Sequence, residues 1–277
     1  MVLTKLSIGT ANFNKNYNFI NSYKIQKREI KEISRYLKKK KIKNIDTALN
    51  YNNERLIKLF CSKSHNIVTK IDLKNFKKNK NNWSLKKNYL INLKNSLKVK
   101  SFYGVLVHIS SHSEIKKRDC KDLINFLINL KREKIIKKIG FSIYEPKDAD
   151  IILKTYDIDL IQIPLNLFDR RFEKQGYLEK FKKKHIEIHT RSIFLQGLLT
   201  EKKIFTKNKN LLKKHKEYFR YLKINKIDPL KLCLNFALNN TNNNFIVFGV
   251  KNLKQLKTIF DNVDDDQTSQ KQDIHLD

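Results

Sequence analysis

Segments that favour strands alternate with segments that favour helices eight times along this chain, and no other feature restricts its fold as much. Short runs of β-branched and other buried-type residues predict the strands, and apolar residues spaced along one face predict the helices. Strands that alternate with helices imply a parallel sheet. Eight such units over roughly 260 residues fit an α/β fold of the closed (β/α)₈ or TIM-barrel type better than an open doubly wound sheet.

The strands are expected at 3–10, 44–48, 66–71, 104–109, 138–143, 160–165, 186–192 and 245–250. The helices are expected at about 52–60 and at 27–40, 84–97, 119–132, 146–155, 173–184, 229–238 and 254–261. No GxGxxG motif follows the first strand, which argues against a Rossmann-type sheet. The loop 200–208 and the helix after it resemble an insertion before the last strand.

Residues 1–262 are predicted to form one barrel domain, because no linker divides them. The segment 263–277 is polar, acidic and rich in Gln and Asp, and it is predicted to be a disordered tail. No stretch approaches the roughly 20 apolar residues of a membrane helix. The first ten residues, MVLTKLSIGT, turn polar too soon for a secretory signal. The protein is therefore expected in the cytoplasm, with no membrane partner.

Composition limits the partners. The formal net charge of +32 and the sequence pI of about 9.9 could indicate nucleic-acid binding. The basic residues are overwhelmingly lysine, however, whereas recognition of bases and phosphates favours the arginine fork. We therefore expect no nucleic-acid partner, although the charge favours capture of anionic ligands. The cysteines, Cys61, Cys120 and Cys233, lack metal-ligand spacing, so no metal site is expected.

Four titratable residues lie at or just after the carboxyl ends of early strands, namely Asp46, Tyr51, Lys70 and His108. In a barrel these strand ends converge on one face, where the catalytic residues of such folds lie. Taken singly, each has a structural explanation: Asp46 can start a turn, Lys70 can be one more surface lysine and His108 can be a core histidine. Their matched positions make a catalytic group the better interpretation.

These four side chains suit proton transfer to a carbonyl oxygen. A free tyrosine has a pKa near ~10 and is a poor acid at neutral pH. A lysine ammonium beside the phenol stabilises the phenolate and lowers that pKa. A carboxylate keeps the lysine charged and oriented, and a neighbouring imidazole can hydrogen-bond the carbonyl oxygen.

The chain also carries a series of motifs, LSIGTANF, IDTALNYNNE, IVTKI, GVLVHI, KKIGFSIY, IQIPLNLFDRR, TRSIFLQGLL and FGVKNLKQL. In these motifs and their order it resembles the aldo-keto reductases up to about Ile259, and most closely the bacterial branch with a seventh strand of the RSIFLQGLL type. The resemblance implies a (β/α)₈ barrel that performs NADPH-dependent reduction of a carbonyl. It places the catalytic tetrad on Asp46, Tyr51, Lys70 and His108, with Tyr51 as the general acid.

The same resemblance implies NADP(H) as the cofactor, which would transfer a hydride to the carbonyl carbon. The residues implied in cofactor binding are Thr10, Asp46, Ser142, Gln162, Arg191, Ser192, Gly197, Gly249, Lys251 and Gln255. Ser142 and Gln162 would hold the nicotinamide carboxamide, and the backbone from Ser192 to Gly197 the pyrophosphate. The last three residues would contact the adenosine end, where Lys251 suits a 2′-phosphate.

The chain departs from the family pattern at several of these positions. Asn52 follows the catalytic tyrosine where the family usually has glycine, and asparagine tolerates a left-handed backbone. Ile143 replaces the usual carboxamide-binding asparagine, and Arg191 replaces an aromatic residue that often stacks on the nicotinamide. Thr258 and Ile259 replace a glutamate and an asparagine at the adenine end, which leaves open the preference for NADPH over NADH.

Several functions are compatible with the sequence. The first is a reductase of a small-molecule aldehyde or ketone, for which family association alone suggests a sugar-like compound as one candidate substrate. The alternative is a non-catalytic, nucleotide-binding member of the family that regulates a protein partner. A basic nucleic-acid-binding protein and a different enzyme on the same barrel are further hypotheses. The sequence indicates neither the substrate nor the oligomeric state.

Overall fold

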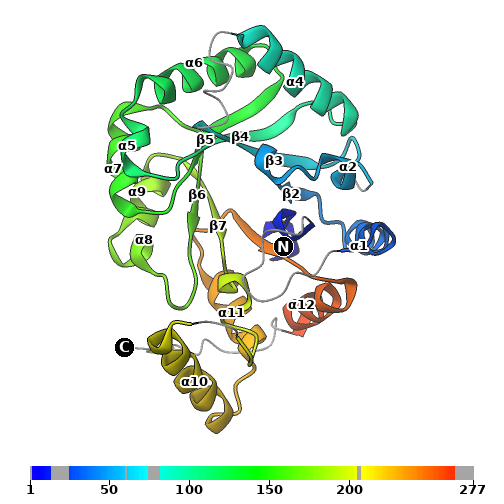
Figure 1. Cartoon of the computed structure of the whole chain (residues 1–277), viewed down its shortest axis with the longest axis vertical. Coiled ribbons are helices and arrows are strands. Elements are labelled where there is room, and N and C mark those ends of the chain that lie inside the picture. Colours follow the sequence, from blue (N-terminus) through cyan, green and yellow to red (C-terminus); the bar gives the residue numbers. More distant parts are fainter. Residues whose placement is uncertain (1, 14–24, 60, 74–81, 205–206, 266–277) are drawn as a thin grey trace.

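The structure is a computed structural model that describes residues 2–13, 25–59, 61–73, 82–204 and 207–265. Its strands form one closed barrel in which each pairs in parallel with its neighbours in sequence, and the last strand pairs with the first (Figure 1). The strands are β1 (Leu6–Gly9), β2 (Asn44–Asp46), β3 (Asn66–Asp72), β4 (Phe102–His108), β5 (Ile136–Ser142), β6 (Leu160–Pro164), β7 (Glu187–Arg191) and β8 (Phe245–Gly249). The predicted (β/α)₈ barrel is therefore confirmed.

Helices surround this barrel in Figure 1. The α-helices are α1 (Lys27–Lys39), α2 (Glu54–Ile57), α4 (Trp83–Ser96), α5 (His112–Ile115), α6 (Arg118–Arg132), α7 (Pro146–Thr155), α8 (Arg171–Lys174), α9 (Tyr177–Lys183), α10 (Lys209–Ile224), α11 (Pro229–Asn239) and α12 (Leu253–Asp265). Short 3₁₀ helices are η1 (Val2–Lys5), η2 (Ala11–Phe13), η3 (Leu49–Tyr51) and η4 (Leu195–Gly197). Within the described ranges, no helix is both long enough and apolar enough to cross a bilayer.

Local sequence explains why these helices begin and face as they do. In α1 the apolar residues Ile30, Ile33 and Leu37 fall on one face and are buried against the barrel. Helix α11 begins where the side chain of Asp228 accepts a hydrogen bond from the backbone of Lys231, with proline at the first helical position. Helical periodicity thus predicted most helices correctly.

Several predicted boundaries were wrong. The first strand begins at Leu6, because the preceding residues form η1. The helix expected at 173–184 is split at Gly176, whose φ of 71° ends α8 and starts α9. The helix expected near 52–60 is described only as α2, and Phe60 lies outside the described residues.

The last helix is longer than predicted. It was expected to end at Asp261, with a tail from Val263, but α12 continues to Asp265. Val263 is 3% exposed and belongs to the barrel core, because it continues the apolar face of the helix. The rest of the predicted tail, 266–277, lies outside the described residues.

The barrel interior holds a small apolar layer between two polar ends. Val68, Leu106 and Leu160 form a cluster of their own inside the ring of strands. Beside them the strands approach closely: a Cβ atom on Gly140 would lie 1.7 Å from the carbonyl oxygen of Leu160. Glycine is therefore required where β5 passes β6.

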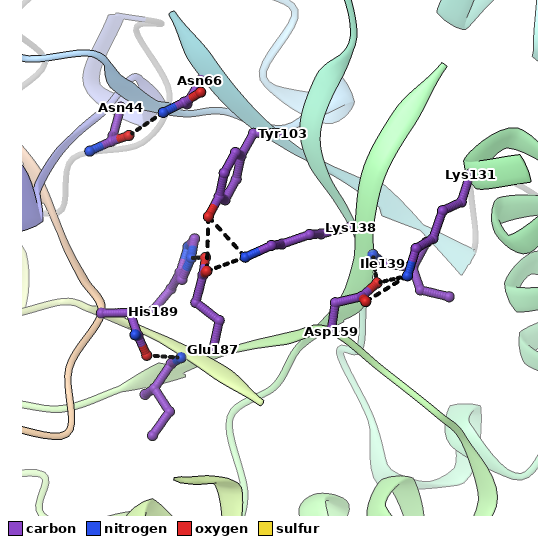
Figure 2. A network of polar contacts seen from close by, with 11 residues as sticks. Asn44, Asn66, Tyr103, Lys131, Lys138, Ile139, Asp159, Glu187 and His189 are labelled. Carbon is purple, nitrogen blue, oxygen red and sulfur yellow. Dashed lines mark hydrogen bonds and ion pairs between the residues drawn. The ribbon is translucent and has the colours of Figure 1, made fainter. Parts of the chain in front are cut away.

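A polar network fills the amino-terminal end of the barrel (Figure 2). Glu187 lies at its centre and accepts hydrogen bonds from Tyr103 at 2.8 Å, from Lys138 and from His189 at 2.6 Å. These residues belong to β4, β5 and β7, so the network joins three strands. Burial alone would raise the pKa of Glu187, but the bonds from His189 and Lys138 lower it to about 2.

The insertion predicted after 200–208 contains α10, at the edge of the molecule in Figure 1. Tyr218 anchors this helix by donating a hydrogen bond to the carbonyl oxygen of Leu199 at 3.3 Å. Its ring also meets Phe168, in the segment after β6, at 5.2 Å between centroids. The insertion therefore covers segments that follow β6 and β7, on the carboxyl-terminal side of the barrel.

Candidate active site

Asp46 and Lys70 form a buried ion pair at the carboxyl-terminal end of the barrel. Asp46 is the last residue of β2 and Lys70 lies on β3, and they are 5% and 3% exposed. The Lys70 Nζ atom lies 2.5 Å from Asp46 Oδ1 and donates a second hydrogen bond, at 3.0 Å, to the carbonyl oxygen of Thr47. Two acceptors, one at the end of β2 and one directly after it, therefore fix the direction of the ammonium.

Tyr51 ends the short helix η3 directly after this strand. The Nζ atom of Lys70 lies 5.7 Å from the centroid of its ring, which puts a cation next to the phenol. Asn52, at the position where the family usually has glycine, adopts the left-handed conformation with φ 49° and ψ 39°. The turn is braced by Asn53, which is 2% exposed and donates a 2.7 Å hydrogen bond to the carbonyl oxygen of Thr10.

His108, the last residue of β4, is held in its neutral form. Burial lowers its pKa most, and the nearby charges of Lys70 and Arg191 add to this, so that the pKa falls to about 4. Its Nε2 atom lies 3.4 Å from the hydroxyl of Tyr144. Its Nδ1 atom is buried and has no hydrogen-bond partner within the part of the chain that the structure describes.

Ser142 and Gln162 are connected to the ion pair. Gln162 donates from Nε2 to Asp46 Oδ2 at 2.7 Å, and its Oε1 accepts a 3.2 Å hydrogen bond from Ser142. A single polar chain therefore runs from Lys70 through Asp46 to β6 and β5. Ile143 is fully buried in the hydrophobic core, so its position offers no side-chain amide to a ligand.

Arg191 ends β7, and its side chain reaches the residues that follow β5. Its guanidinium donates to the carbonyl oxygen of Ile143 at 3.1 Å and to the hydroxyl of Ser192 at 3.4 Å. The guanidinium carbon lies 4.1 Å from the centre of the Tyr144 ring. After Ser192 the backbone turns sharply, with left-handed φ values that include 61° at Ser192 and 93° at Gly197.

Lys251, Gln255 and Gly249 lie together at the end of β8. Gln255 accepts a 2.7 Å hydrogen bond from the backbone of Lys251, and the Nζ atom of Lys251 lies 2.9 Å from Glu201 Oε1. A Cβ atom on Gly249 would lie 2.8 Å from the side-chain Nδ2 atom of Asn12, so little space remains at this strand end. Contacts thus link Lys251 to the segment after β7.

Three further predicted positions can now be placed. The hydroxyl of Thr10, directly after β1, is fully buried and has no partner among the described residues. Thr258 donates its hydroxyl to the carbonyl oxygen of Lys254 in its own helix, and Ile259 is fully buried. Thr258 is therefore an exposed residue bonded to its own helix, and Ile259 faces the core.

The structure thus brings Asp46, Tyr51, Lys70 and His108, the four predicted catalytic residues, together at one end of the barrel. A family model described as the Aldo/keto reductase family matches residues 5–274. The chain belongs to the aldo/keto reductase family. This family consists of oxidoreductases that use a nicotinamide cofactor on small carbonyl compounds. No curated protein sequence matches the chain.

Solved structures of bacterial members of the family share the fold. The aldo-keto reductase AKR11C1 from Bacillus halodurans, in its holo form, superposes with a TM-score of 0.71 at 16% identity and covers 94% of this chain and 86% of its own. The glycerol dehydrogenase AKR11B4 from Gluconobacter oxydans superposes with a TM-score of 0.65 at 16% identity, and the match covers 99% of this chain and 95% of the dehydrogenase. At this identity the likeness shows the architecture alone.

Two residues of the site were missed from the sequence. Asn53 braces the turn after β2, but an asparagine directly after a turn does not by itself reveal a hydrogen bond to the carbonyl oxygen of Thr10, 43 residues earlier. Tyr144 contacts both His108 and Arg191, and its place two residues after Ser142 at the end of β5 was the available indication. No group of three or more His, Cys, Asp and Glu side chains suited to a metal ion occurs in the described ranges.

Proposed function

We propose that the chain is an NADP-dependent reductase of aldehydes or ketones, with Tyr51 as the general acid. One observation carries the proposal: the buried Lys70–Asp46 ion pair lies beside the Tyr51 ring, on the same barrel face as a neutral His108. A cation beside a phenol stabilises the phenolate left when the proton departs. This arrangement suits donation of a proton to a carbonyl oxygen.

Each residue of the tetrad has a separate task in this mechanism. Tyr51 gives its proton to the oxygen of the bound carbonyl as charge develops there. Lys70 stabilises the phenolate, and Asp46 directs the ammonium through their 2.5 Å contact. His108, neutral above a pH of about 4, donates a hydrogen bond that orients the same oxygen.

The residues around the tetrad fit a nicotinamide dinucleotide in part. The buried Thr10 hydroxyl without a partner, the Ser142–Gln162 pair and the left-handed turn after Ser192 are polar features suited to binding it. When bound, NADPH supplies the hydride that reduces the carbonyl carbon. Gln162 already donates to Asp46 and accepts from Ser142, so only the second lone pair of its carbonyl oxygen and the second N–H of its amide are left for a carboxamide.

Preference for NADPH over NADH rests on Lys251 in this proposal. An ammonium at the end of β8 suits a 2′-phosphate, and its partner Glu201 would have to share it. The positions of Thr258 and Ile259 supply no carboxylate or amide, so adenine would be held chiefly by packing. We therefore expect the phosphate contact to account for most of the discrimination.

The decisive experiment is the Tyr51→Phe variant, tested against simple and sugar-like aldehydes and ketones by loss of NADPH absorbance. We expect turnover to fall by about 10²–10⁴-fold because the proton donor is removed, while the NADPH dissociation constant measured by calorimetry stays within about threefold. Tyr89→Phe is the matched control, since Tyr89 is 49% exposed and its hydroxyl contacts Glu54. Turnover retained by Tyr51→Phe would refute Tyr51 as the acid.

The second candidate is a nucleotide-binding regulatory protein without catalysis. The observation in its favour is the apolar, buried Ile259 at the adenine end, where the family usually has a polar residue. The same calorimetry separates the candidates: cofactor binding without turnover on any carbonyl compound supports regulation, and binding of neither NADPH nor NADH contradicts both.

A further inference from the structure

Tyr144 lies at the mouth of the candidate site without filling the core. It follows the fully buried Ile143 and is itself 38% exposed. Its hydroxyl lies 3.4 Å from His108 Nε2, and the two ring centroids are 5.8 Å apart with the planes tilted by 41°. A hydroxyl aimed at the catalytic imidazole is the distinctive feature of this position.

The hydrogen-bond inventory of His108 explains why that contact matters. At neutral pH the imidazole carries one proton, because its pKa of about 4 keeps the ring neutral. Nδ1 is buried without a partner among the described residues, and a buried N–H without an acceptor is rarely tolerated. The proton therefore belongs on Nε2, where the Tyr144 oxygen can accept it.

Arg191 holds Tyr144 in this place. Its guanidinium lies 4.1 Å from the centre of the Tyr144 ring, a distance suited to a stacked cation–π contact. Arg191 is itself fixed by its hydrogen bonds to Ile143 and Ser192. The backbone carbonyl of Tyr144 accepts a further hydrogen bond from Arg171 at 3.2 Å, so both ring and main chain are restrained.

We propose that Tyr144, clamped by Arg191, is a positioning residue that keeps the proton of His108 on Nε2 and directs it at the substrate. Before substrate binds, the Tyr144 oxygen accepts this hydrogen bond. The carbonyl oxygen of the substrate then takes it over, already aligned for protonation by Tyr51. The inference rests on the proposed function, since it assigns Tyr144 a task in that reaction.

The test combines a spectroscopic measurement with kinetics on Tyr144→Phe, which keeps the ring for Arg191 and removes only the hydroxyl. Long-range ¹H–¹⁵N spectra of ¹⁵N-histidine-labelled protein report the tautomer of His108, identified by the signal lost in His108→Gln. We expect one Nε2–H tautomer in the unmodified protein and a mixture of both tautomers in Tyr144→Phe. We also expect kcat to fall about tenfold with KM within about twofold.

Tyr221→Phe is the matched control, because Tyr221 is 39% exposed on α10, and it should change neither quantity. Arg191→Lys, which keeps the charge but loses the planar stack, should shift the tautomers in the same direction as Tyr144→Phe. An unchanged tautomer in Tyr144→Phe overturns the proposal, and so does an unchanged kcat. Because the spectra need no turnover, absence of reductase activity in the unmodified protein would refute the proposed function and leave the tautomer result decisive for Tyr144.

Discussion

At the scale of single residues, Lys70 is a buried cation whose substitution we expect to affect both stability and turnover. The residue is 3% exposed, and its ammonium contacts a carboxylate and a backbone carbonyl and lies 5.7 Å from the centre of the Tyr51 ring. A buried charge is tolerated only when it is paired, and removal of one partner leaves the other uncompensated. Lys70 is therefore important for folding, and because the proposed mechanism also gives it a chemical role, a substitution must be designed to separate the two.

We predict that Lys70→Met abolishes turnover and lowers the free energy of unfolding by about 3 kcal/mol, because Asp46 remains buried without its cation. The double variant Lys70→Met with Asp46→Asn should recover much of the stability, since the carboxylate is gone, but none of the turnover. Urea unfolding and NADPH oxidation measure the two effects. Recovery of activity in the double variant would show that the ammonium has no chemical task.

At the scale of elements, the contact between β5 and β6 at Gly140 is the tightest constraint on the barrel. A Cβ atom there would lie 1.7 Å from the carbonyl oxygen of Leu160, which belongs to the paired strand. Neither backbone can move without breaking the ladder that positions Ser142 and Gln162, which pair in the same register.

We predict that Gly140→Ala costs about 3 kcal/mol of unfolding free energy or more, because the two strands must separate. Gly176→Ala is the control: its φ of 71° disfavours alanine, but a Cβ there would meet nothing within 4 Å. That change should cost about 1 kcal/mol. Thermal unfolding of both variants measures the two losses of unfolding free energy. Equal losses would show that backbone conformation, rather than contact between strands, determines the cost of alanine at both sites.

The order of elements could be predicted from the sequence because each element carries its own periodicity. Errors arose where two signals competed. The acidic residues after Val263 were taken as the start of a tail, although Leu256, Ile259, Phe260 and Val263 continue a helical apolar face. Gly176 was included in a single helix because glycine inside a helical pattern does not by itself reveal a positive φ.

The convergence of Asp46, Tyr51, Lys70 and His108 was predictable because strand ends converge in a barrel, so four positions in sequence become one place in space, while their catalytic role stays a prediction. The side-chain contacts around these four residues could not be predicted from the sequence. The contact between Arg191 and Tyr144 joins the ends of β7 and β5, and its formation depends on side-chain directions that no local pattern encodes. The bond from Gln162 to Asp46 spans the barrel in the same way.

At the scale of the whole molecule, the barrel has two polar ends with different tasks. Val68, Leu106 and Leu160 form an apolar layer inside it, and the tetrad lies at the carboxyl end. At the amino end Glu187 binds Tyr103, Lys138 and His189, and the proposed mechanism does not require these groups (Figure 2). The net charge is already +32, so further protonation in acid increases the repulsion between positive charges and destabilises the fold in a general way. The network around Glu187 adds a specific contribution to the free energy of unfolding that is also lost in acid.

The sign of that contribution follows from Glu187, whose folded-state pKa is lowered from 4.5 to about 2. A carboxyl group with a depressed pKa stabilises the fold fully above its unfolded value, and the effect disappears as pH falls from about 4.5 to about 2. We predict that Glu187→Gln lowers the free energy of unfolding by about 3 kcal/mol at pH 7 and by much less at pH 3. Turnover should be unchanged, since Glu187 lies at the opposite end of the barrel from Tyr51.

Urea unfolding at the two pH values measures this difference, with Glu133→Gln as the matched control. The Glu133 side chain is 43% exposed in its ion pair with Lys87, so its removal should cost less than about 1 kcal/mol at either pH. A loss in Glu187→Gln that is the same at pH 7 and pH 3 would mean that the glutamate acts by packing rather than by its charge. A pH-dependent loss with intact turnover would establish that one end of this barrel stabilises the fold while the other holds the catalytic tetrad.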